Sequence, residues 1–558
     1  MLGAPAAHCR PLVFWMSDTH DGVRVDRSSL LQRLGHRVID ASYKGPHTIL
    51  GVEGLEVLVN ADAAILPLED RAPLIQRHTY AGWPVAEGAI RGMFEFYRAS
   101  AWRRELVQHV DAFACTFPPS FCEAYLPYNR TIVWMPGHRY AFGRCSRAAW
   151  DVLSTHLRKA ANDSFAAARG GALHVVAAGT VFDAQYVNYF TGLTPVVLDM
   201  SALGYAPRFA EGGLAHTMKR PEILVGPLHL GNFKQVAWFF TKDYRERSKF
   251  KFATASGLYG HYRLADLMQH RAMVIMPYSV ASIGLNEVHA LGLPIFAPSA
   301  ALMARSRDLG WDVQISNSPH YCRAGTEGGV PPQHPDARHP YSPEDESEAA
   351  RRYWFGFADQ AVLPNVTTFE SQDDLEAKLA AADFASIHAA MNAANQRRAA
   401  ALAARWDSVF ARVEASGGAA RRVPASYEEG MRALWDEERA SVLDGDAVPP
   451  HAYGYPTEYQ RSNAARTQEK VRAPLPAAAT RGYVGAGLSR WPGVPPREGA
   501  DAPDDGFWRR LRTAGPHIKD PGPRPGPAAG PGAGGSAAGP ATRKPGPRRG
   551  RRGGPRGG

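Results

Sequence analysis

Short, almost purely apolar runs that recur along the chain constrain its fold more than any other feature. They show little alternation between apolar and polar residues, which is typical of strands buried on both faces. Strands of this kind belong to parallel sheets that are covered by helices on both sides. The runs occupy residues 11–16, 111–117, 131–137, 172–180, 195–200, 222–227, 271–279 and 293–299.

Segments with helical periodicity separate these runs. Leu30, Leu31 and Leu34 fall on one face of a helix that we expect to end at Gly35. The alternation of strands and helices predicts an α/β fold. Further helices are expected at residues 149–163, 182–192, 284–292 and 373–383, and in a long Ala-rich stretch that reaches about Val413.

The pattern favours two α/β halves. Residues 201–221 hold three glycines and two prolines, and we interpret them as a linker. We therefore expect two Rossmann-like domains facing a cleft, with ligands bound outside the carboxyl ends of the strands. The expected divisions are an N-terminal domain at 1–210, a C-terminal domain at 222–415 with an inserted proline-rich loop at 324–348, a partly ordered extension at 416–520 and a disordered basic tail at 521–558.

The net charge of +10 is concentrated in that tail. Residues 521–558 carry eight Lys or Arg and no acid, which leaves the other 520 residues nearly neutral. The tail sequence RKPGPRRGRRGGPRGG resembles the arginine-glycine segments of RNA-binding proteins. Without interleaved aromatic residues, it supports at most weak, nonspecific RNA contact, and a charged tail with no partner is an equal alternative.

Cysteine usage and hydropathy indicate a compartment. The five cysteines are an odd number with no CxxC pair, so a reduced interior is the simplest interpretation, with Cys115 and Cys122 as small core residues. The apolar run at 12–16 is too short for a signal peptide, and no window is long enough to span a bilayer. We expect a cytoplasmic protein without a transmembrane segment.

Residues 271–299 are the most informative stretch. The strand in this stretch ends at Pro277, and the small residues of the loop that follows include Ser279, Ser282 and Gly284. We expect the loop to open a helix whose first turn carries Glu287 and whose N–H groups form a seat for an anion. A carboxylate here can accept the hydroxyls of a ribose.

This stretch resembles the donor motif of GT-B glycosyltransferases. In that pattern a small-residue loop precedes a helix with a ribose-binding glutamate, followed by Gly and Pro, here Gly292 and Pro294. The resemblance implies that Glu287 holds the ribose of a nucleotide sugar, and that Ser279, Ser282 and Gly284 contact its diphosphate. Many retaining members carry an earlier glutamate where this chain has Ser279. The stereochemical outcome therefore stays open.

Each of these residues has a plainer alternative. Glu287 would then be a solvated acid at a helix N-terminus, and the loop residues would serve only the turn. His289 lies off the helical face of Glu287 and is better interpreted as a packing or surface histidine than as a phosphate ligand.

A second candidate site follows the first strand, in the sequence SDTHDG. His20, paired with Asp18 or Asp21, has the chemistry of a general base for an acceptor hydroxyl. The alternative is that both aspartates cap turns and His20 is exposed. A metal site lacks a second set of ligands at recognisable spacing, so we expect no metal.

Basic groups and loops complete the expectation. The resemblance implies that cations and helix N-termini, rather than a metal, neutralise the leaving diphosphate, and Lys234 is the favoured cation. His138 and Arg139 are candidates for an acceptor pocket. The alternatives are a solvated charged face around Lys234 and a loop held by buried aromatic residues around His138.

The resulting expectation is a metal-independent hexosyltransferase-type enzyme without a cofactor. It would transfer a sugar from a nucleotide-sugar donor to an unknown acceptor. The first alternative is a catalytically inactive GT-B-like scaffold whose tail binds RNA or an acidic partner. The second is a sugar-nucleotide epimerase on the same plan.

Overall fold

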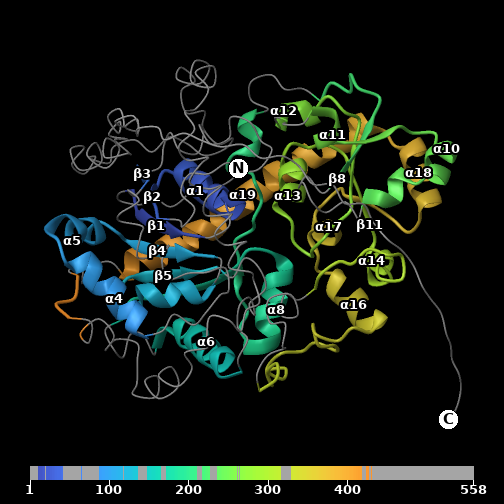
Figure 1. Ribbon diagram of the computed structural model, residues 1–558. Helices are drawn as coiled ribbons and strands as arrows, with labels where there is room; N and C mark the ends of the chain where they lie inside the picture. Colours follow the sequence, from blue (N-terminus) through green and yellow to red (C-terminus); the bar gives the residue numbers. More distant parts are fainter. Residues whose placement is uncertain are drawn as a thin grey trace, which may run out of the picture. The chain divides into compact units, whose positions relative to one another are not determined.

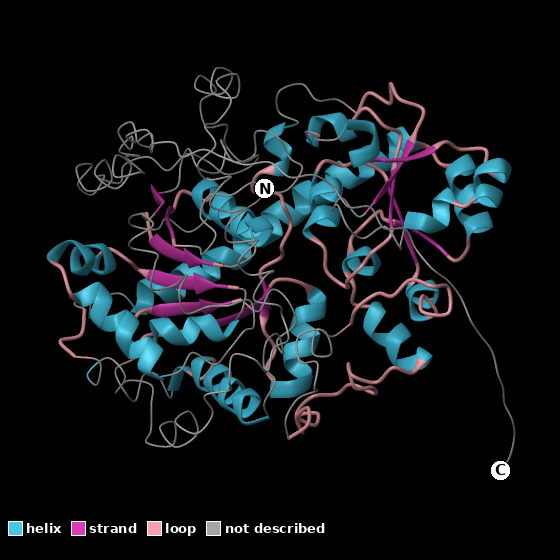
Figure 2. Cartoon of the chain, in the orientation of Figure 1, coloured by secondary structure: helices cyan, strands magenta, loops and turns pink. Residues whose placement is uncertain are grey.

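The computed structural model describes most of the first 416 residues. The described residues are 11–18, 21–41, 64–65, 87–116, 119–135, 147–164, 171–209, 216–226, 236–259, 262, 264–315, 328–416, 423–426 and 429. The expected tail at 521–558 and nearly all of the expected extension at 416–520 lie outside them. Figure 2 shows the strands gathered in two groups with helices around them, which confirms the expected α/β class.

Within the described residues, the first sheet is parallel and has seven strands in the order β3-β2-β1-β4-β5-β6-β7. The central strands are buried along their whole length, as their apolar runs predict. The strands are β1 (Val13–Ser17), β2 (Arg37–Asp40), β3 (Ala64–Ile65), β4 (Ala112–Cys115), β5 (Thr131–Trp134), β6 (Val175–Ala178) and β7 (Val196–Val197).

Helices connect these strands, and two of their ends follow clear local rules. Helix α8 begins after Thr180, whose side chain accepts a hydrogen bond from the N–H of Asp183, and it ends at Gly192 in the left-handed region. The other helical elements of this half are α1 (Asp21–Arg33), α4 (Glu87–Arg98), α5 (Ala101–Gln108), η1 (Pro119–Tyr128), α6 (Arg147–Ala160), α8 (Val181–Thr191) and η2 (Ala206–Phe209).

Aromatic side chains pack η1 onto the first sheet. The ring of Tyr125 stacks on Phe113 of β4 with 4.3 Å between centroids. Cys115 and Cys122 lie in this core, as the sequence predicts, but they are joined by a disulfide with 5.8 Å between their Cα atoms. The expectation of reduced cysteines is therefore wrong for this pair: η1 turns back on β4 and brings the two side chains together.

The second sheet is parallel, and the part that the structure describes has five strands in the order β12-β11-β10-β8-β9. The strands are β8 (Ile223–Gly226), β9 (Phe252–Thr254), β10 (Met273–Ile275), β11 (Ile295–Pro298) and β12 (Thr367–Phe369). The helical elements around it are η3 (Trp238–Phe240), α10 (Lys242–Arg247), α11 (Ala255–Tyr259), α12 (Leu264–Leu267), α13 (Ile283–Ala290), α14 (Ala300–Ala304), α16 (Glu348–Phe355), α17 (Asp359–Val362) and α18 (Gln372–Ala381).

Both sheets have the strand order of doubly wound folds. In the first, β2 and β4 lie on opposite sides of β1, and in the second, β9 and β10 lie on opposite sides of β8. Consecutive connections leave the sheet in opposite directions at these points, and doubly wound folds bind their ligands there, outside the carboxyl ends of the strands. The two Rossmann-like sheets expected from the sequence are therefore present.

A single long helix, α19 (Phe384–Ser416), connects residues of both halves. Figure 1 draws it in orange beside α13, and Asn395 on α19 donates a hydrogen bond to the carbonyl of His289 on α13. Further along the helix, the rings of Trp406 and Phe410 pack edge-on against Phe14 of β1, with centroids 6.2 and 5.8 Å away. The Ala-rich stretch is thus a continuous helix, as predicted.

The expected insertion at 324–348 packs back onto α8 where the structure describes it. The N–H of His334 donates to the carbonyl of Tyr189, and Tyr186 donates its hydroxyl proton to Glu344. The side chain of His339 lies within hydrogen-bond distance of Asn188 and stacks on Trp354 of α16.

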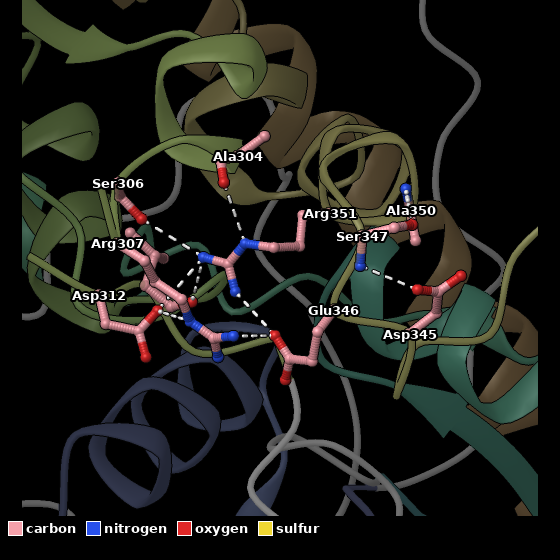
Figure 3. A network of polar contacts seen from close by, with 10 residues as sticks. Ala304, Ser306, Arg307, Asp312, Asp345, Glu346, Ser347, Ala350 and Arg351 are labelled. Atoms are coloured by element: carbon pink, nitrogen blue, oxygen red, sulfur yellow. Dashed lines mark hydrogen bonds and ion pairs between the residues drawn. The ribbon is translucent and has the colours of Figure 1, made fainter. Parts of the chain in front are cut away.

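A buried guanidinium fastens the next part of this segment. Figure 3 shows Arg351 of α16 bonding the carbonyl of Ala304 and the hydroxyl of Ser306, with ion pairs to Asp312 and Glu346. These contacts tie α16 to the turn after α14.

Among the described helices, none is long and apolar enough to cross a membrane.

Candidate functional site

The loop after β10 lies at the switch point of the second sheet, where doubly wound folds bind ligands. It contains Ser279, Ser282 and Gly284, and it leads into α13. The N-cap residue Ser282 is extended, and its own side chain makes no capping bond. Helix α13 begins at Ile283, so Glu287 is its fifth residue. The expectation that Glu287 belongs to the first turn is wrong, because the helix begins one residue before the expected start.

The carboxylate of Asp359 on α17 occupies the start of α13. Its Oδ2 accepts hydrogen bonds from the N–H of Ser282 at 2.9 Å and from Nδ2 of Asn286 at 3.0 Å. Burial raises the pKa of Asp359 to about 7, and the negative charges of Asp199 and Asp183 add to this rise. The carboxyl group of Asp359 therefore already occupies the helix N-terminus at which the sequence predicts a bound anion.

Glu287 is buried, with only 3% of its surface exposed. Its Oε1 accepts a hydrogen bond of 2.5 Å from the hydroxyl of Tyr205, which lies in the segment that follows the first sheet. Burial raises the pKa of Glu287 to about 7; the bond from Tyr205 lowers it and the charge of Asp26 raises it. The carboxyl thus points away from solvent, toward residues of the first half, and the alternative of a solvated helix acid is excluded.

Two buried polar atoms flank the same loop. Oγ of Ser279 and Oδ1 of Asn286 make no hydrogen bond within the described part of the chain. Ser279 is 3% exposed and Asn286 is 1% exposed. Buried polar atoms normally have a partner, so these two mark the loop as a place for a further group.

A group of charged residues connects segments of the two halves. The sequence alone does not single out these residues. Arg398 of α19 pairs with Asp199 at 2.6 Å, after β7, and also approaches Nδ1 of His289 at 3.0 Å. Arg27 of α1 is fully buried and donates to the carbonyl of Asp199 at 2.9 Å. Burial lowers the pKa of Arg27, whereas Asp26 and other acids nearby raise it. These contacts bring the carboxyl edge of the first sheet close to α13.

His289 is a packing residue, as the sequence favours. It is buried, and its Nε2 lies 2.8 Å from the carbonyl of Pro364. Burial, with a contribution from the charge of Arg398, lowers the pKa of His289 to about 4, so it is neutral at pH 7.

The loop after the first strand is described only in part. Asp18 directly follows β1 and is 2% exposed, and Asp21 is the first residue of α1. His20 and the side chain of Asp21 lie outside the described residues. Asp18 lies at the β1 switch point of the first sheet. Its role in this site and its pairing with His20 stay predictions.

A carboxylate at the end of β2 is already paired. Asp40 closes β2, the position at which dinucleotide-binding folds carry their ribose-binding acid. Here a buried ion pair with Arg24 of α1 occupies it. The first sheet therefore does not present this carboxylate to a ribose.

The remaining candidates fall outside the site as described. Lys234, His138 and Arg139 are not among the described residues. Of the neighbouring basic residues, Arg247 pairs with Asp373 and Lys251 with Glu222, which fits a solvated charged face. No group of three or more His, Cys, Asp or Glu residues in the described ranges could hold a metal ion.

The solved structures that are similar to this chain include the following three. They are the glycotransferase of kitacinnamycin (12% identity, 72% of this chain and 99% of that chain covered, TM-score 0.28), the calicheamicin glycosyltransferase CalG4 (14%, 79% and 100%, 0.25), and UGT89C1 of Arabidopsis thaliana complexed with UDP (12%, 78% and 100%, 0.25). With TM-scores below 0.3, the likeness is one of remote architecture and carries no argument about reaction or substrate.

No protein-family model matches the chain, and no curated protein matches it in sequence.

Proposed function

We propose that this chain is a glycosyltransferase that takes its sugar from a nucleotide-sugar donor. The observation that supports this most is the buried carboxyl of Glu287, carried by the helix that follows the switch-point strand β10 and bonded by Tyr205. A carboxylate in this crevice can accept hydroxyl groups of a ribose, and it lies where doubly wound sheets bind nucleotides. Asp40 of the first sheet is paired with Arg24, which favours the second sheet as the nucleotide site.

The proposed roles follow from position and chemistry. Glu287 holds the ribose, and the loop with Ser279, Ser282 and Gly284 contacts the donor. His20, oriented by Asp18 or Asp21, takes the proton of the acceptor hydroxyl, and Lys234 stabilises the charge that develops on the leaving diphosphate. His138 and Arg139 contact the acceptor.

Nucleotide binding tests this proposal. Isothermal titration of the full chain with UDP, GDP and their sugar conjugates should give binding for at least one nucleotide, and Glu287→Ala should weaken it at least tenfold. Turnover that persists in EDTA would support the proposed metal independence. His20→Ala should lower kcat far more than it changes the affinity for the donor, because a base acts only on the acceptor.

The departure at Ser279 favours one alternative, a GT-B-like scaffold without activity. If no nucleotide of the panel binds and Glu287→Ala has no effect, the result would support the inactive scaffold. Release of an epimerised donor sugar in the absence of any acceptor would instead support the epimerase.

A further inference from the structure

The N-terminus of α13 is closed to a second anion. Asp359 binds the N–H of Ser282 through its carboxylate, and its own N–H donates to the carbonyl of Val280 at 2.9 Å. Asp359 is 5% exposed, so its charge is poorly screened by water when it is ionised. The favourable end of the helix dipole is therefore already used, and a phosphate placed beside it would meet a carboxylate.

The orientation of the Asn286 amide is fixed by two acceptors. Its Nδ2 lies 3.0 Å from Oδ2 of Asp359 and 3.2 Å from the carbonyl of Ser282. The remaining atom, Oδ1, is then an acceptor, and it has no hydrogen-bond partner in the described ranges. The hydroxyl of Ser279 is likewise buried and unbonded there, and it can donate or accept.

These two atoms select a ligand chemistry. Oδ1 of Asn286 needs a donor, which an ionised phosphate does not offer. A sugar or ribose hydroxyl offers both a donor and an acceptor, which is the chemistry that each of these two atoms needs. Leaving such atoms buried without a partner lowers the stability of the ligand-free protein, as is common for groups kept for binding.

We propose that Asp359 makes the loop at 279–284 a hydroxyl site rather than a diphosphate seat, with Ser279 and Asn286 binding a hydroxyl group of the donor. This inference rests on the proposed function and changes which part of the donor meets the loop. The diphosphate then binds elsewhere in the same crevice. The hydroxyl comes from the ribose or from the transferred sugar.

The test uses the full chain with uridine, guanosine, UDP, GDP, UDP-glucose, GDP-mannose and inorganic pyrophosphate as probes. Ser279→Ala should lower the affinity for the hydroxyl-bearing ligand about tenfold. It should leave the melting temperature unchanged or raise it, because a buried unbonded hydroxyl is removed. A loss already seen with UDP or GDP assigns the hydroxyl to the ribose, and a loss confined to the sugar conjugates assigns it to the sugar.

Two further variants sharpen the result. Ser299→Ala is the matched control: Ser299 caps α14 through a bond from the N–H of Leu302, so this change should lower the melting temperature and leave every affinity unchanged. Asp359→Asn keeps an acceptor for Ser282 and Asn286 but removes the charge. At about pH 8.5, well above the pKa of about 7 of the wild-type Asp359 carboxyl, this variant should bind pyrophosphate at least tenfold more tightly than the wild type.

Three results would overturn the proposal. The first is a pair of findings: pyrophosphate competes with UDP or GDP for the wild type as strongly as the nucleoside does, and Ser279→Ala leaves the affinity unchanged. Together these findings refute the hydroxyl site, while the proposed function stands. An ordered water that bonds both atoms and stays in place in a ligand-bound crystal structure refutes it as well. No binding by any probe refutes both the hydroxyl site and the proposed function.

Discussion

Glu287 illustrates how one residue carries both a predictable and an unpredictable part of this structure. Its place after a strand and a small-residue loop, with Gly292 and Pro294 behind it, is legible in the sequence and predicts a carboxyl at the ligand end of the sheet. Its partner Tyr205 lies 82 residues away in a segment that we interpreted as a linker. No local pattern signals that contact, because it depends on how two halves of the chain pack.

Burial makes the contribution of Glu287 to stability depend on pH. Its pKa rises from 4.5 to about 7 on folding, so this contribution is fully present below about pH 4.5 and is lost as the pH rises through 7. Glu287→Gln keeps an acceptor for Tyr205 and has no proton to lose. The variant should match the wild type near pH 5 and exceed it near pH 8 by up to about 3 kcal/mol, measured by urea unfolding.

The comparison removes the effect of other titrating groups. Burial lowers the pKa values of His174 and His289 from 6.5 to about 4, so their contribution is lost as the pH falls from 6.5 to 4, in the opposite direction. Both proteins share these histidines. A difference between variant and wild type that does not grow with pH would contradict the buried, ionisable state of Glu287.

Gly292 gives a prediction about the end of α13. Its φ of +74° favours glycine, and a Cβ there would lie 2.4 Å from Oδ1 of Asn392 on α19. Gly292→Ala should lower the free energy of unfolding by about 2 kcal/mol, from backbone strain and displacement of Asn392. Gly310 has a φ of +80° and nothing within 4 Å, so Gly310→Ala is the control for strain alone and should cost about 1 kcal/mol. Equal losses of unfolding free energy in the two variants would show that the side chain of Asn392 leaves room for a Cβ atom at position 292.

At the scale of elements, the sequence predicts where strands and helices lie better than it predicts which of them contact one another. The apolar runs at 131–137 and 271–279 contain β5 and β10, and the predicted helix at 182–192 is α8 with Gly192 at its end. The disulfide was not predicted, because the return of η1 onto β4 is a tertiary feature. The role of Asp359 was missed for the same reason: it follows the proline-rich insertion in a sequence without a recognisable motif.

Helix α19 supplies a prediction at this scale. Trp406 is completely buried and packs on Phe14 of β1, so Trp406→Ala should lower the free energy of unfolding by about 3–5 kcal/mol. Gln396 on the same helix is exposed, and Gln396→Ala should change it by less than about 0.5 kcal/mol. Chemical denaturation of both variants measures the difference. A cost below about 1 kcal/mol for the tryptophan would mean that α19 does not pack on the first sheet as described.

At the scale of the whole chain, the excess positive charge and the candidate site lie in different parts of the sequence. The eight basic residues of 521–558 account for most of the net charge, and the candidate site lies far earlier in the sequence. Removal of 521–558 should therefore leave the nucleotide affinity within about twofold while it lowers the affinity for single-stranded RNA at least tenfold in low salt. Filter binding and titration calorimetry measure the two affinities. Unchanged RNA affinity would mean that the tail does not contact RNA.

A crystal structure of the full chain soaked with UDP or GDP tests the central claim most directly. The account predicts a ribose hydroxyl within about 3 Å of the Glu287 carboxylate, beside the loop that precedes α13. A nucleotide bound at the carboxyl edge of the first sheet instead, with Glu287 still covered by Tyr205 alone, would contradict it.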